Sequence, residues 1–227
     1  TSSNEWQYLE TEFFSPDNQI YFHPLTFQNA SKGNGWIDDI SIVKVKSPAE
    51  TIRAIESKSA LSEWDTQILG RYYFLKGNKE KVKYILSIGT ITTKSDLACF
   101  MAKQTKNKKA RISYILDMIK YDGMTFHNSE TRLSEMTADF TASEKIALAE
   151  KIVSKLPLAI SPARACARLM DTFVASSSEY KTLSAKGKFI ASAEKVAKTA
   201  QKAYSSNEQL NKEVEPAIRR IEVAREN

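Results

Sequence analysis

The densest group of side chains that could do chemistry in this 227-residue sequence is a run of lysines in its middle. Residues 76–111 hold ten Lys and Arg residues against two acids, which gives them a net charge of +8 in a chain whose total is +6. Binding of a polyanion through counterion release requires such a concentration of cations, and nearby tyrosines could stack on bases. The polyanion-binding candidates are Lys79, Lys81, Lys83, Lys103, Lys106, Lys108, Lys109 and Arg111.

The same stretch fits a second interpretation, in which the lysines lie in solvated loops between helices. Lys-rich loops between helices are commonly solvated surface features that keep a protein in solution. In addition, Arg111 is the one residue of the stretch with the planar fork that grips a phosphate group, because all the other cations are lysines. We therefore favour solvated loops and keep nucleic acid as the alternative partner.

The sequence offers few groups for catalysis. It has no Gly-rich phosphate loop, no Gly-x-Ser-x-Gly elbow and no His-Glu-x-x-His motif. The two histidines, His23 and His127, are far apart in the sequence, and the two cysteines, Cys99 and Cys166, are too few for a disulfide framework or a zinc site. We expect a protein without enzymatic activity.

The elements that would position these groups differ between the two ends of the chain. Residues 6–14, 19–27 and 36–45 are rich in aromatic and β-branched side chains and are separated by turn residues, which predicts an antiparallel β-meander. After Ser47 the apolar residues recur at helical spacing. The predicted fold class is therefore α+β, with a short N-terminal β-meander over residues 1–46 and then a mainly helical domain of about eight helices.

Polar residues mark where these helices should begin. Ser47-Pro48-Ala49-Glu50 offers a cap, a first-turn proline and a capping-box glutamate. Further predicted starts are Asn78, Thr93 or Ser95, Asn107, Thr141 with Glu144, Ser161 with Pro162, and Asn207. We divide the helices into a bundle over residues 47–177 and long surface or partner-binding helices over 178–227. No apolar run approaches the roughly 18 residues that a membrane span needs.

The N-terminal 46 residues resemble a known family. The stretches that carry the resemblance are Trp6-Gln7-Tyr8-Leu9-Glu10, Ile20-Tyr21-Phe22 and Gly35-Trp36-Ile37-Asp38-Asp39-Ile40-Ser41-Ile42. Over residues 6–45 they resemble the closing strands of the galactose-binding-like jelly roll, as in family 4/9 carbohydrate-binding modules. The resemblance implies that an upstream part of the same precursor, or another protein chain, completes the sandwich.

The resemblance also implies two kinds of site. Trp6, Tyr21 and Trp36 are the aromatic residues that would stack on a glycan, although packing into a core is the commoner role for such rings. Asp38 or Asp39 would take the place of the acidic residue that helps to hold a structural calcium ion in that family. Calcium needs about six to eight oxygen ligands, and the sequence does not supply the rest of the set.

Two functions are left open by the sequence. The first, which we favour, is a non-catalytic structural or adhesion segment of a larger extracellular or virion protein, part of an assembly and in contact with glycan. The second is a basic helical nucleic-acid-binding protein that uses residues 76–111. Binding measured at increasing salt concentration would distinguish these two functions, because the affinity for a polyanion falls steeply with salt and the stacking of a sugar on an aromatic ring does not weaken in this way.

Overall fold

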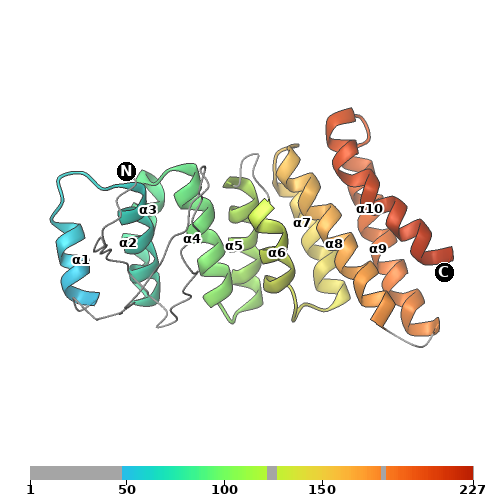
Figure 1. Cartoon of the computed structure of the whole chain (residues 1–227), viewed down its shortest axis with the longest axis horizontal. Coiled ribbons are helices and arrows are strands. Elements are labelled where there is room, and N and C mark those ends of the chain that lie inside the picture. Colours follow the sequence, from blue (N-terminus) through green and yellow to red (C-terminus); the bar gives the residue numbers. More distant parts are fainter. Residues whose placement is uncertain (1–47, 122–126, 180–182, 227) are drawn as a thin grey trace, which may run out of the picture.

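The computed structural model describes residues 48–121, 127–179 and 183–226. All the regular elements in these residues are α-helices: α1 (Pro48–Glu56), α2 (Glu63–Leu75), α3 (Lys79–Ile88), α4 (Ile91–Gln104), α5 (Lys108–Tyr121), α6 (His127–Met136), α7 (Ala142–Lys155), α8 (Ile160–Glu179), α9 (Leu183–Tyr204) and α10 (Glu208–Glu226). The helices stand side by side in chain order, from α1 at one end of an elongated molecule to α9 and α10 at the other (Figure 1).

The expected α+β class is wrong for this part of the chain. The described residues form ten helices, where we predicted about eight, and they contain no strand. The β part of the prediction depended on the aromatic and β-branched segments 6–14, 19–27 and 36–45, and these segments lie outside the described residues. What the structure describes is an all-helical array.

Four of the predicted helix starts, at Asn78, Asn107, Thr141 and Asn207, are confirmed by their hydrogen bonds. The Asn78 side chain accepts a hydrogen bond from the backbone N–H of Lys81 at 3.1 Å, at the start of α3. At the start of α7, Thr141 and Glu144 form a reciprocal capping box. Such side chains satisfy backbone N–H groups that have no partner inside the helix.

The predicted start at Thr93 or Ser95 is wrong, because α4 begins one turn earlier. The Thr90 hydroxyl accepts a hydrogen bond from the Thr93 backbone N–H at 3.1 Å and caps the helix. Thr93 is itself fully buried, and its hydroxyl lies 3.3 Å from that of Thr66 on α2. The polar residue that we took for a cap therefore helps to hold α4 against α2.

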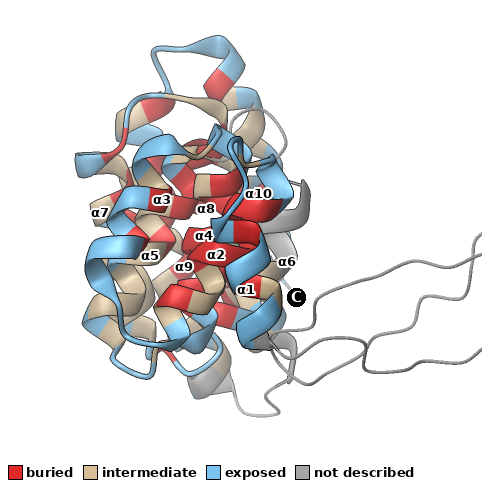
Figure 2. Cartoon of the chain, turned by 90° about the vertical axis from the view of Figure 1, so that its left-hand side faces the viewer, coloured by how far each residue is buried: buried red, intermediate tan, exposed pale blue. Residues whose placement is uncertain are grey.

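The buried apolar side chains form two clusters that meet at α4. Ile52, Leu69 and Ile85 belong to the first cluster, which joins α1, α2, α3 and α4. The second cluster runs from α4 to α10. Leu97 of α4 belongs to the first cluster and Ala98 to the second, so α4 is the wall that the two share. Figure 2, a view from the α1 end, shows the buried residues on the inner sides of the helices.

The two C-terminal helices belong to the second cluster. α9 buries Val196, Ala200 and Tyr204 there, and α10 buries Val214 and Ala217. α8, which also contributes to this cluster, extends past residue 178 to Glu179. Among the described residues, none of the helices is both long enough and apolar enough to cross a bilayer.

Candidate functional site

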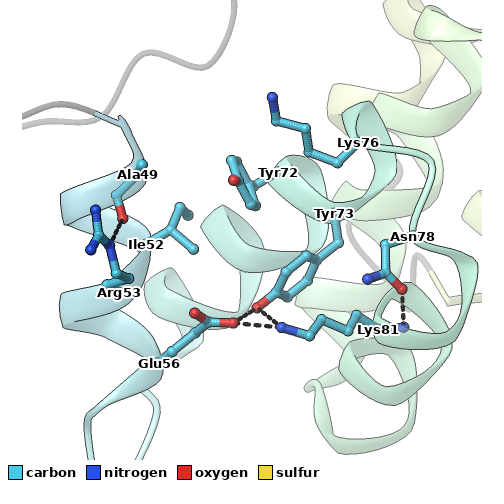
Figure 3. A pocket seen from close by; sticks show the side chains of 9 residues that line it. All are labelled: Ala49, Ile52, Arg53, Glu56, Tyr72, Tyr73, Lys76, Asn78 and Lys81. Atoms are coloured by element: carbon cyan, nitrogen blue, oxygen red, sulfur yellow. Dashed lines mark hydrogen bonds and ion pairs between the residues drawn. The ribbon is translucent and has the colours of Figure 1, made fainter.

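A pocket of about 340 Å³ lies where α1 meets the α2–α3 hairpin (Figure 3). α1 supplies one wall, and the end of α2 with the start of α3 supplies the other. The lining residues are Ala49, Ile52, Arg53, Glu56, Tyr72, Tyr73, Lys76, Asn78 and Lys81. Three of the four charged residues in this lining are cations, which gives the pocket an excess of positive charge.

A polar cluster of Glu56, Tyr73 and Lys81 closes one side of the pocket and joins its three helices. The Tyr73 hydroxyl donates a hydrogen bond to the Glu56 carboxylate. Lys81 Nζ donates to the same carboxylate oxygen at 2.7 Å and to the Tyr73 hydroxyl at 3.1 Å. Because Lys81 Nζ also lies 4.5 Å from the centre of the Tyr73 ring, the lysine is held both by the ring and by the carboxylate.

These contacts fix the protonation states of all three groups. Hydrogen bonds from Lys81 and Tyr73 lower the pKa of Glu56, and the hydrogen bond with Glu56 raises the pKa of Lys81 to about 12. Burial raises the pKa of Tyr73, and its hydrogen bond to Glu56 raises it further. None of the three shifts moves a pKa toward neutrality, as a general acid or base working near pH 7 would need. The cluster is therefore suited to holding α1 in place.

Two other cations of the pocket have no carboxylate partner among the described residues. Arg53 Nε donates a hydrogen bond to the carbonyl of Ala49, one turn earlier on α1, at 3.3 Å. Lys76 Nζ lies 5.8 Å from the centre of the Tyr72 ring. Arg53 and Lys76 are both exposed, so their charged groups can contact a negatively charged ligand.

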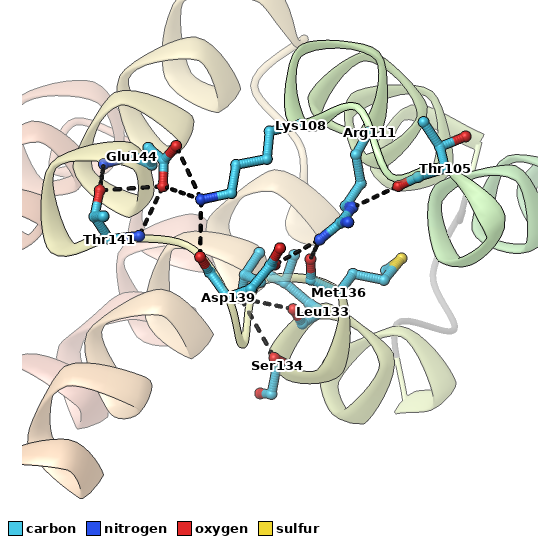
Figure 4. A network of polar contacts seen from close by, with 10 residues as sticks. Thr105, Lys108, Arg111, Leu133, Ser134, Met136, Asp139, Thr141 and Glu144 are labelled. Carbon is cyan, nitrogen blue, oxygen red and sulfur yellow. Dashed lines mark hydrogen bonds and ion pairs between the residues drawn. The ribbon is translucent and has the colours of Figure 1, made fainter.

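Five of the eight predicted polyanion-binding residues already pair with a carboxylate, and Figure 4 shows two of them, Lys108 and Arg111. Lys108 Nζ donates to the Glu144 carboxylate and to the Asp139 carbonyl, both at 2.9 Å. Arg111 Nη1 donates to the Asp139 carboxylate at 2.5 Å and to the Met136 carbonyl at 3.3 Å. Lys108 and Arg111 of α5 thus bind Asp139 in the connection between α6 and α7 and residues of the two helices beside it.

Three more residues of the predicted set are paired in the same way. Lys81 pairs with Glu56, as described above, and Lys103 of α4 pairs with Glu135 of α6 at 2.7 Å. Lys83 pairs within α3 with Glu80 at 3.2 Å. A cation that already holds a carboxylate would have to give up that pair before it could neutralise a phosphate group.

Lys79, Lys106 and Lys109 are the members of the predicted set that are exposed and form no ion pair among the described residues. The acids that neutralise Lys81, Lys103, Lys108 and Arg111 lie outside residues 76–111 in the sequence. Four of the ten cations in this stretch are therefore matched by acids from outside it, while Arg132 of α6 pairs with Asp96 inside it.

The glycan-stacking candidates Trp6, Tyr21 and Trp36 lie outside the described residues, and so do the calcium candidates Asp38 and Asp39. Glycan contact and calcium binding at these positions stay predictions of the sequence. Within residues 48–121, 127–179 and 183–226, no three His, Cys, Asp or Glu side chains come together as metal ligands would.

The two cysteines are packing residues. Cys99 and Cys166 are both buried, and burial raises the pKa of each thiol, that of Cys166 to about 12. A thiol is nucleophilic as the thiolate, so these pKa shifts leave both sulfur atoms unreactive near neutral pH. Cys99 Sγ does lie 3.8 Å from Arg132 Nη1, but the desolvation of the thiol outweighs the effect of this cation on its pKa.

Arg53, Glu56 and Lys76 line the pocket but were not among the site residues predicted from the sequence. Glu56 stands 25 positions before Lys81, and no local spacing links these two residues. Tyr73 was noted as one of several tyrosines near the lysines, without a partner. Comparison with known proteins adds no further guide, since no family model, no curated protein and no solved structure matches this chain.

Proposed function

We propose that this chain is a non-catalytic structural segment, a helical scaffold that takes part in an assembly with other protein chains. The observation that carries the proposal is the use of its charged side chains. Cations and carboxylates from different helices pair with one another along the array. The side chains that could have acted on a ligand or substrate are largely engaged in holding helices together.

Two arginine pairs support the proposal at the C-terminal end. Arg164 of α8 donates from Nε and Nη2 to the two carboxylate oxygens of Glu213 on α10, at 2.7 and 3.1 Å. In the opposite direction, Arg220 of α10 donates from Nε and Nη2 to the two carboxylate oxygens of Asp171 on α8, at 2.8 and 2.9 Å. Two parallel hydrogen bonds from one guanidinium fix direction as well as distance, so these pairs set how α10 lies on α8.

Ion pairs between lysine and glutamate side chains support the scaffold proposal in the middle of the array. Lys103 joins α4 to α6, and Lys108 joins α5 to α7. Partly exposed pairs of this kind contribute at most about 1 kcal/mol each, so the apolar core supplies most of the stability. Their effect is on geometry, because each pair joins helices that are not consecutive in the sequence.

Nucleic-acid binding is the second candidate function, and one observation favours it. Lys79, Lys106 and Lys109 are exposed and unpaired among the described residues, so they could still contact phosphate groups. With Lys76, which is also exposed and without a carboxylate partner among the described residues, these four lysines make a smaller electrostatic footprint than the ten cations in residues 76–111 suggest.

Binding of a labelled single-stranded oligonucleotide to the full chain tests the proposal. For a scaffold, we expect weak binding and the same weak binding in the Lys106→Gln/Lys109→Gln double variant. A matched control is Lys198→Gln/Lys202→Gln, which removes the same charge from two exposed positions on α9. Tight binding that falls steeply between about 50 and 200 mM salt, and that the first double variant alone abolishes, would replace the scaffold with the nucleic-acid function.

A further inference from the structure

The pocket between α1 and the α2–α3 hairpin has an unbalanced charge. Arg53, Lys76 and Lys81 contribute three positive charges, and Glu56 contributes the one negative charge of the lining. Glu56 is already engaged by Lys81 and Tyr73. The net charge that the lining offers to a ligand is therefore two positive charges, on Arg53 and Lys76.

An apolar surface lies beside these two cations. Ile52 of α1 is 3% exposed and forms part of the first core cluster, and the half-buried Tyr72 ring stands across from it (Figure 3). The Tyr72 ring packs against Tyr73 in an edge-to-face arrangement, with 5.6 Å between the ring centres. A ligand that enters here meets charge and an aromatic face together.

The walls of the pocket are set before any ligand arrives. Lys81 is held by Glu56 and Tyr73 at its side chain and by the Asn78 cap at its backbone. Tyr73 is 6% exposed, so its ring cannot turn away without opening the core. A site that is already ordered loses less entropy on binding than a flexible one.

We propose that this pocket binds an acidic peptide segment of a partner protein. One carboxylate of the peptide pairs with Lys76, and another pairs with the Nη groups of Arg53, for which the structure shows no partner among the described residues; the two cations lie on opposite walls of the pocket (Figure 3). A neighbouring aliphatic or aromatic side chain lies against Tyr72 and Ile52. This ligand goes beyond the proposed scaffold function, because a scaffold needs no peptide pocket.

The size of the pocket and the number of its cations favour a peptide over a nucleic acid. A volume of about 340 Å³ is near the lower limit for ligand sites, and it suits one or two side chains. Two unpaired cations match two carboxylates. A nucleic-acid strand needs a longer row of cations along its backbone, and most of the neighbouring cations are engaged in ion pairs.

Calorimetric titration of the full chain with a blocked peptide, Glu-Asp-Phe-Asp-Glu, tests the proposal, and the neutral peptide Gln-Asn-Phe-Asn-Gln is the control ligand. We expect the acidic peptide to bind and the neutral one to bind at least about tenfold more weakly. Arg53→Gln and Lys76→Gln should each weaken binding about tenfold, since each removes a charge-assisted hydrogen bond. Both residues are exposed, so helical melting curves should stay unchanged.

The matched control variant is Lys83→Gln, which removes the same charge from an exposed lysine on α3 that does not line the pocket. It should leave the affinity unchanged. Equal weakening in Lys83→Gln and Lys76→Gln would reduce the effect to general attraction by a basic protein and overturn the site, as would the absence of binding. An oligonucleotide that binds more tightly than the peptide, through Arg53 and Lys76, would overturn the choice of ligand.

Discussion

The Glu56 carboxylate accepts hydrogen bonds from Lys81 and from the Tyr73 hydroxyl, and these bonds lower the pKa of Glu56 below its ordinary value of 4.5. A carboxyl group whose pKa is lower in the folded chain than in the unfolded chain stabilises the fold above its ordinary pKa. That contribution is lost as the pH falls through the folded value. The raised pKa of Lys81, about 12, has the opposite sign and matters only in alkali.

We therefore predict a pH-dependent effect of Glu56→Gln. At pH 7 the variant should have a lower free energy of unfolding than the original chain, because it loses a charged partner for Lys81. The difference should begin to shrink as the pH falls below 4.5, the ordinary pKa of the carboxyl, and should be lost once the pH has fallen through the lower pKa that Glu56 has in the folded chain. Urea unfolding at several pH values measures this difference in the free energy of unfolding. Glu150→Gln, at an exposed position, is the control. A difference that stays constant down to strong acid would contradict the role given to Glu56.

At the scale of one residue, the sequence identified Lys81 as a site residue and missed its partners, Glu56 and Tyr73. Lys81 stands out by composition, because it belongs to a basic stretch. Its meaning depends on Glu56, which comes close to it only after α1 packs against α2 and α3. Because Glu56 lies 25 positions before Lys81, no local sequence pattern indicates that the two residues pair. Lys81 was therefore predicted to bind a ligand, whereas in the structure it holds α1 in place.

Among the elements, α2 and α4 approach closely because Gly70 has no side chain. A Cβ added at Gly70 would lie 2.6 Å from Leu97 Cδ2 and 3.2 Å from Ile85 Cγ2. Leu97 and Ile85 are almost fully buried and have no room to move away. Gly187 on α9 has no atom within 4 Å of the same position. The two glycines thus form a matched pair, one under steric constraint and one without it.

Alanine at these two positions should have opposite effects. Gly70→Ala should lower the free energy of unfolding by about 1 kcal/mol, since overpacking outweighs the gain in helix propensity. Gly187→Ala should raise it by about 0.5 to 1 kcal/mol, because propensity acts there without a clash. Chemical denaturation of both variants provides the measurement. If Gly70→Ala were as stabilising as Gly187→Ala, the close approach of α2 and α4 would be wrong.

The helix starts were predictable where a cap stands alone in the sequence. Asn78 and Thr141 each precede an apolar run and begin helices in the structure. Ser62 was missed, although Ser62 and Asp65 form a capping box at the start of α2. Thr93 or Ser95 was predicted as the cap of α4, and Thr90 was missed, although all three are polar residues before an apolar run. Only the burial of Thr93 against Thr66 distinguishes Thr93 from Thr90, and burial is a tertiary property.

At the scale of the whole molecule, net charge along the sequence was a poor guide to net charge in space. Residues 76–111 have a net charge of +8, but acids from α1, α7 and the end of α6 fold against them. The helical character after residue 47 could be predicted from apolar spacing. The arrangement of the helices in one array could not, because the contacts between α8 and α10 or between α5 and α7 join residues far apart in the sequence.

The measurement that tests the scaffold most directly compares two adjacent lysines on α5. Lys108 is paired with Glu144, whereas Lys109 is exposed and has no ion pair among the described residues. Both lie in the first turn of the same helix, so Lys108→Gln and Lys109→Gln change the same charge in nearly the same place. We expect Lys108→Gln to lower the free energy of unfolding by about 1 kcal/mol and Lys109→Gln to change it by less than about 0.5 kcal/mol. Equal effects of the two substitutions, or no effect of Lys108→Gln, would contradict the claim that the paired cations of this chain hold its helices together.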